Sequence, residues 1–175
     1  MKMNMYPDLT YKIVASPLLE DINMDDAVDW ACEMLMSGYE TPTLLILSGL
    51  TKPTNYFETS QYVKNTLKEL HFRTLSQDES RIANMTYYLL KIVQQKDIKG
   101  WLYSLHEFLK SEDDFGNDFS LLYWAWDEFD YSQEQHYWEG ATKDNIEAIV
   151  VGQARRWLKA NQTVIDTLLP NTNYS

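Results

Sequence analysis

The 175-residue sequence predicts an all-α protein, a single-domain bundle of about six to seven helices. Apolar residues recur at three- and four-residue steps in most segments, which is the period of a helix with one buried face. Only six glycines and five prolines interrupt the chain, so long helices are permitted. The expected connections are short, which favours antiparallel neighbours in a bundle.

The first two expected helices follow from their end signals. From Asn23 the sequence NMDDAVDWACEMLMS begins with acids, which a helix N-terminus favours, and the helix stops at Gly38. Its inner face is expected to consist of Ala27, Val28, Ala31, Met34 and Leu35. The next helix has Thr41 as its N-cap and Pro42 at its first position, and it ends at Gly49. Residues 5–19 stay open between irregular structure and a short extended N-terminal segment.

Two longer helices are expected in the middle of the chain. The first spans residues 54–71, with Thr54 as its N-cap and His71 at its C-terminal end, where a cationic imidazole would interact favourably with the helix dipole. Its inner stripe is expected to consist of Tyr56, Ser60, Val63, Leu67 and Leu70. The second spans residues 76–98 and has the clearest helical period, formed by Ile82, Met85, Leu89, Ile92 and Val93.

Three further helices complete the prediction. Gly100 separates the preceding helix from residues 101–110, whose stripe is Trp101, Leu102, Leu105, Phe108 and Leu109. The next helix spans about residues 118–129. The last opens near Thr142 and carries Arg155, Arg156 and Lys159 near its C-terminal end, as the helix dipole favours.

The negative charge of the chain lies in two blocks. Residues 13–51 contain seven acids and no Lys or Arg, and residues 111–142 contain nine acids and no Lys or Arg. The net charge is −11, so the remaining residues sum to +5. A strongly acidic surface repels nucleic-acid phosphates and attracts cationic partners, although it also serves solubility alone.

The sequence predicts no catalytic residue, no cofactor and no metal site. The nearest two glycines, Gly38 and Gly49, are eleven positions apart, so no glycine-rich phosphate loop exists, and neither E-x-x-H nor H-E-x-x-H occurs. Cys32 is the single cysteine and is expected to be buried and inert, and the three histidines are expected at the surface or at helix caps. The longest aliphatic run, Leu44 to Leu47, is far shorter than a membrane span, and no secretory signal follows Met1, so a cytoplasmic location is expected.

The stretch LLYWAWDEFDYSQEQHYWEG, residues 121–140, holds seven aromatic side chains and five carboxylates without any Lys or Arg. If residues 118–129 are helical, then Leu122, Ala125, Trp126 and Phe129 share one face and can be buried. The other flank combines rings with acids, which suits an interface with a basic protein, because Trp and Tyr supply strong contacts and a charged rim steers association. We call this flank the acidic aromatic face and expect it to consist of Trp124, Asp127, Glu128, Asp130, Tyr131, Glu134, Tyr137, Trp138 and Glu139.

Three other interpretations of this stretch are open. The rings can pack under a loop while the carboxylates simply face water. A carbohydrate-binding or glycoside-processing site would pair Asp127 or Glu128 with Glu134 about 5 to 9 Å apart beside aromatic platforms. An acidic mimic of DNA would need carboxylates spaced along an elongated face like phosphates.

Two segments, WACEMLMSGYETPTLLILSGL and LLYWAWDEF, carry a resemblance to a class of known proteins. The pattern over residues 24–72 and 118–138 resembles small helical bacterial proteins of uncharacterised type, several of which look like immunity proteins encoded beside secreted toxins. The resemblance is apolar in character and transfers no functional residue. It implies a non-enzymatic cytoplasmic binder, possessing the acidic surface that an inhibitor of a cationic toxin or nuclease would display.

Overall fold

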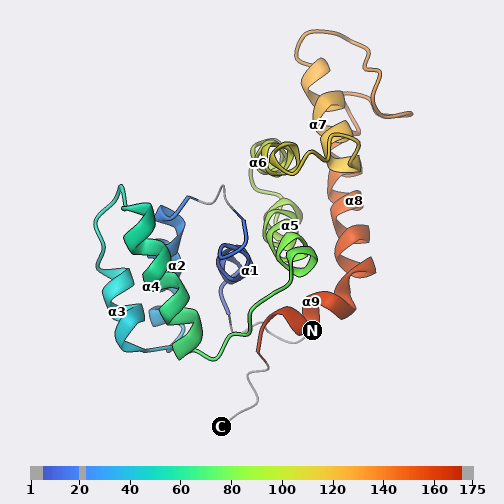
Figure 1. Cartoon of the computed structure of the whole chain (residues 1–175). Helices are drawn as coiled ribbons and strands as arrows, with labels where there is room; N and C mark the ends of the chain where they lie inside the picture. The colour runs from blue at the N-terminus through green and yellow to red at the C-terminus, as the bar shows by residue number, and fades with distance from the viewer. Residues whose placement is uncertain (1–5, 20–22, 171–175) are drawn as a thin grey trace. The chain divides into compact units, whose positions relative to one another are not determined.

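The computed structural model describes residues 6–19 and 23–170, and nine α-helices and no strand occur within them (Figure 1). The all-α fold class is therefore confirmed, whereas the expected count of six to seven helices is too low because α1 and α9 were missed. The helices are α1 (Leu9–Ala15), α2 (Asp25–Met36), α3 (Pro42–Ser48), α4 (Tyr56–Glu69), α5 (Gln77–Val93), α6 (Ile98–Ser111), α7 (Asp118–Glu128), α8 (Ile146–Ala160) and α9 (Gln162–Leu168).

The described chain forms two compact units. Unit 1 runs up to Tyr87 and takes in the residues from Thr163 onward, and unit 2 comprises residues 88–162. Helix α5 therefore contributes its first part to unit 1 and its last part to unit 2. The expectation of a single domain over residues 1–175 stays a prediction.

In unit 1, α1 packs against α2, α2 against α3, and α3 against α4. The segment that the sequence left open as extended is helical over Leu9–Ala15, while residues 1–5 lie outside the described part. A seven-residue helix is not stable alone, so α1 depends on burying Leu9, Tyr11, Ile13 and Val14. The expected inner face of α2 omitted Trp30, whose side chain is fully buried and donates its indole N–H to the Thr10 hydroxyl at 3.0 Å.

The predicted N-cap is correct for α3 and wrong for α4. Thr41 caps α3 by accepting the Leu44 backbone N–H at 3.2 Å, with Pro42 at the first position as expected. Helix α4 is capped by Asn55 and not by Thr54, whose hydroxyl and backbone N–H both donate to Asp25. The expected stripe of α4 is accordingly wrong in part, since its buried residues are Thr59, Val63, Thr66 and Leu67.

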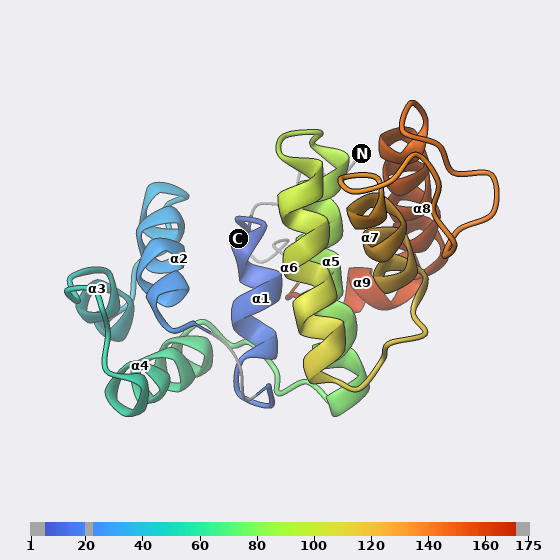
Figure 2. The same cartoon turned by 90° about the horizontal axis from the view of Figure 1, so that it is seen from above.

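In unit 2, α6, α7 and α8 pack against one another. The last part of α5 also contacts α6, since the ring centroids of Tyr88 and Phe108 are 6.4 Å apart. Figure 2 shows α6 and α7 side by side, with the loop after α7 in orange. The fully buried side chains that fix this packing include Leu89, Ile92, Leu102, Leu105, Leu109, Phe119 and Leu122.

Helix α6 begins earlier than the sequence predicts. Gly100 was expected between two helices, but it lies in the first turn of α6, whose N-cap is Asp97. The Asp97 carboxylate accepts the Gly100 backbone N–H at 3.2 Å, and a Cβ at position 100 would lie 2.3 Å from Asp97 Oδ2. Glycine is therefore present because the cap needs the space, and not because the helix ends there.

Candidate functional site

Helix α7 and the loop that follows it carry the acidic aromatic face, and all nine of its expected residues belong to unit 2. Asn117 caps α7 by accepting the Phe119 backbone N–H at 3.1 Å. Phe119, Leu122 and Ala125 are buried on the inner side of α7. Trp124 follows Leu122 by two positions and therefore lies on another face, where it is exposed, whereas Asp127 and Glu128 are half-buried.

The aromatic side chains of the face are substantially exposed. The exposed fractions are 38% for Trp124, 87% for Tyr131 and 44% for Tyr137. Trp138 is half-buried and contributes less surface. Large aromatic groups with this exposure provide apolar contact area that water covers in the free protein.

Five rings form a continuous cluster that we call the ring ladder, made of Tyr103, Tyr123, His106, Trp124 and Tyr137. The ring centroids of Tyr103 and Tyr123 are 5.5 Å apart. Tyr123 stacks on His106 with a centroid distance of 4.5 Å and an interplanar angle of 17°. His106 meets Trp124 edge-on at 5.0 Å, and Trp124 lies 6.2 Å from Tyr137 in the following loop. The ladder thus joins α6, α7 and the loop at separations typical of favourable aromatic pairs.

His106 is the buried member of the ring ladder, and the expectation of a surface histidine is wrong at this position. Its side chain is 2% exposed, and its Nδ1 lies 3.2 Å from the Ser120 hydroxyl oxygen. Burial lowers the pKa of His106, although the carboxylates of Glu107 and Asp127 act in the opposite direction. The sequence contained a signal for this burial, because His106 follows Leu102 by four positions and precedes Leu109 by three.

The loop after α7 is held to the helix by defined hydrogen bonds. The Glu128 carboxylate accepts the His136 backbone N–H at 2.8 Å and lies 3.3 Å from the His136 Nδ1. The Gln135 side-chain oxygen accepts the backbone N–H groups of Tyr137 and Trp138, at 2.9 and 2.8 Å. These bonds explain how residues of an irregular segment keep Tyr137 beside Trp124.

The five carboxylates of the face have different surroundings. Asp130 forms an ion pair with Lys99 of α6 at 2.6 Å, and Glu128 is engaged by His136. Asp127, Glu134 and Glu139 form no ion pair within residues 6–19 and 23–170. Fewer carboxylates of the face are therefore unpaired than the sequence indicated, because Lys99, which is distant in the chain, neutralises Asp130.

The structure also adds residues that the sequence analysis did not place at this site. Tyr103 of α6 is 48% exposed and extends the aromatic surface through its contact with Tyr123. Burial raises the pKa of the Tyr123 phenol, and the nearby charge of Asp127 acts in the same direction. Tyr103 and Tyr123 belong to different helices, so short-range sequence patterns could not reveal their contact.

Three other features of the described residues concern metal ligands, the cysteine and helix length. No cluster of three or more His, Cys, Asp or Glu residues capable of holding a metal ion occurs in this part of the chain. Cys32 is exposed, not buried as expected, and its thiol lies 3.8 Å from the Ser48 carbonyl oxygen. None of the helices in residues 6–19 and 23–170 is long and apolar enough to cross a membrane.

Searches of family models, curated proteins and solved structures found no match to this chain. The assignment of the candidate site is therefore supported by its geometry alone.

Proposed function

We propose that this protein is a non-enzymatic, intracellular protein-binding module whose acidic aromatic face docks on a basic partner. The observation that carries the proposal is the combination of exposed rings with unpaired acids. The rings of Trp124 and Tyr137 lie together at the surface, with their centroids 6.2 Å apart. Glu134 and Glu139 are exposed and form no ion pair in the described residues. Aromatic anchors bounded by charge of one sign are typical of protein interfaces with steered association.

An immunity-type inhibitor of a cationic toxin is the specific form of binder that we propose. The bacterial resemblance noted in the sequence supports this form, and so does the fixed loop, because a preorganised surface loses less entropy on binding. With opposite potentials, association could approach roughly 10⁸ M⁻¹ s⁻¹ at low salt and would fall steeply as ionic strength rises.

The site is tested best by changing only those carboxylates that hold no internal bond. Reversing Asp130 or Glu128 would also remove the contact with Lys99 or with His136, so those variants confound binding with local structure. The double variant Glu134→Lys/Glu139→Lys avoids this problem. Its matched control is Asp78→Lys/Asp144→Lys, which makes the same change in net charge at two exposed acids elsewhere.

The partner to assay is the protein encoded beside this chain's gene. We expect the wild-type chain and the control variant to bind it and to suppress its toxicity on co-expression. We expect Glu134→Lys/Glu139→Lys to associate at least tenfold more slowly at low salt, with a smaller difference at high salt. Equal association rates for the two double variants would exclude the acidic aromatic face as the docking site.

A further inference from the structure

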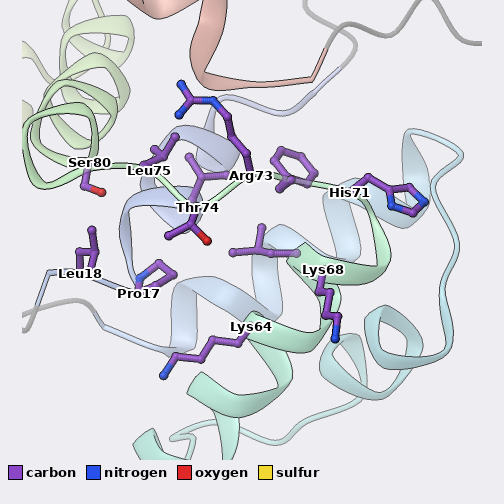
Figure 3. Close-up of a pocket in the computed structure, with 12 residues that line it drawn as sticks. Pro17, Leu18, Lys64, Lys68, His71, Arg73, Thr74, Leu75 and Ser80 are labelled. Atoms are coloured by element: carbon purple, nitrogen blue, oxygen red, sulfur yellow. The ribbon is translucent and has the colours of Figure 1, made fainter.

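Unit 1 contains a pocket of about 560 Å³ that the proposed function does not use. It lies between the C-terminal end of α1, one face of α4 and the segment that leads from α4 into α5 (Figure 3). Its volume falls within the range of roughly 300 to 1,000 Å³ typical of small-molecule sites.

The floor of the pocket is apolar and its rim is cationic. The buried lining includes Val14, Leu67 and Leu75, which are exposed by 7% or less. Lys64 and Lys68 of α4 lie at the exposed rim, and their spacing of four positions places them on the same side of the helix. Among residues 6–19 and 23–170, no Asp or Glu lines the pocket, although the whole chain has a net charge of −11.

The positive charge at the rim is available to a ligand. Lys64 and Lys68 form no ion pair within the part of the chain that the structure describes. Arg73 differs, because its guanidinium is paired with Glu79 at 2.8 Å and also donates to the Thr167 carbonyl oxygen. Arg73 therefore supports the wall of the pocket, while the two lysines supply uncompensated cations on flexible stems.

A second observation points to a bound molecule. Ser80 lines the pocket and is fully buried, and its hydroxyl has no hydrogen-bond partner among the residues that the structure describes. In Figure 3, Ser80 lies at the start of α5, across the pocket from Lys64 and Lys68 of α4. Buried hydroxyl groups normally have a partner, so the Ser80 hydroxyl is available to a ligand atom that displaces the side chains now covering it.

We propose that this pocket binds a small amphipathic carboxylate. The carboxylate interacts with Lys64 and Lys68 at the rim, the apolar body covers Leu67 and Leu75, and a hydrogen-bonding atom at the buried end pairs with Ser80. The proposal is independent of the acidic aromatic face, because every lining residue belongs to unit 1.

The test measures binding of hexanoate, octanoate and decanoate to the full chain by isothermal titration calorimetry. We expect affinity to rise about fourfold for each added methylene until the pocket is filled. Decanol, which lacks the charge, and acetate, which lacks the apolar body, should bind at least tenfold more weakly than decanoate. Equal affinity for decanol and decanoate, or no binding by any of the three acids at millimolar concentration, would overturn the proposal.

Variants then locate the site. Lys64→Gln/Lys68→Gln is expected to weaken decanoate binding about tenfold. Lys143→Gln/Lys159→Gln, which removes the same charge at exposed positions of unit 2, should leave it unchanged. Because all four lysines are exposed, both variants should keep the wild-type thermal stability. Decanoate should shift backbone amide NMR resonances in residues 64–80, and shifts confined to residues 100–140 would place the ligand elsewhere and refute the assignment.

The role of Ser80 has its own comparison. The ω-hydroxy derivatives of the same acids are assayed beside their parents. We expect at least one derivative to bind about fivefold more tightly than its parent, because its hydroxyl pairs with Ser80. Ser80→Ala should abolish that gain and leave the affinity for the parent acid within about twofold. If no derivative gains affinity, or if the gain persists in Ser80→Ala, then Ser80 is not part of the binding site.

Discussion

Glu128 is expected to act by positioning the loop after α7, and the exchange rate of a single amide proton tests this role. The Glu128 carboxylate accepts the His136 backbone N–H at 2.8 Å, and its side chain is 33% exposed. Replacing Glu128 by Ala removes the acceptor. Hydrogen bonds to charged groups contribute about 1.5 to 3 kcal/mol when they are well buried. Solvent screening at this partly exposed position reduces the contribution to about 1 kcal/mol.

A loss of about 1 kcal/mol corresponds to a roughly fivefold larger population of the open loop. The exchange rate of the His136 amide, measured by NMR and corrected for its intrinsic rate, should therefore increase about fivefold in Glu128→Ala. Glu128→Gln keeps an oxygen acceptor, so its increase should be about twofold or less. Glu134→Ala is the matched control, since Glu134 accepts no hydrogen bond from the loop in the described residues. An unchanged rate in Glu128→Ala, or an equal increase in Glu134→Ala, would refute the reasoning.

Three further predictions concern stability and titration. Leu122 is fully buried, so Leu122→Ala should lower the free energy of unfolding by about 2 to 5 kcal/mol in urea denaturation, and a loss under about 1 kcal/mol would contradict the described packing of α7. The pKa of His106 is lower in the folded protein than its ordinary value of 6.5, so the folded state disfavours protonation and loses stability as pH falls below about 6.5. His106→Gln cannot protonate, and its stability relative to wild type should improve between pH 7 and pH 5; a constant difference would contradict the shift. Hydrogen bonds from Arg73 lower the pKa of Glu79 to about 2, so this carboxylate stabilises the fold above its ordinary pKa of 4.5 and loses that contribution as pH falls toward 2. Arg73→Gln should raise the pKa of Glu79, as measured by carboxyl ¹³C NMR, and an unchanged titration would show that the pair does not form in solution.

The all-α fold could be predicted because helices are encoded locally. Thr41, Pro42 and Gly49 mark the ends of α3 through side-chain capping and backbone restriction, which act within a few residues. The same local rules placed α7 within one residue of its observed end. Helix α1 escaped prediction because seven residues contain too little periodic pattern, and only its burial in unit 1 stabilises it.

The composition of the candidate site could be predicted in part. The sequence identified the rings and carboxylates of residues 124–139, and the structure leaves Trp124, Tyr131 and Tyr137 exposed. The burial of His106 was missed because the stripe of α6 was defined by its apolar residues alone, although its spacing from Leu102 and Leu109 places it on the same face. The sequence could not show that Asp130 is paired, since its partner Lys99 is 31 positions away in the chain.

The sequence by itself determined the helical class, the ends of helices such as α3 and α7, and the two acidic blocks, because capping, periodicity and charge depend on residues that are near one another in the chain. Tertiary structure decided which of these residues meet solvent. It paired Asp130 with Lys99, enclosed His106 between two rings, and assembled the pocket of Lys64, Lys68 and Ser80 from separate segments of unit 1. The physical reason is that burial and ion pairing depend on distance in space, and short-range sequence patterns contain little information about that distance.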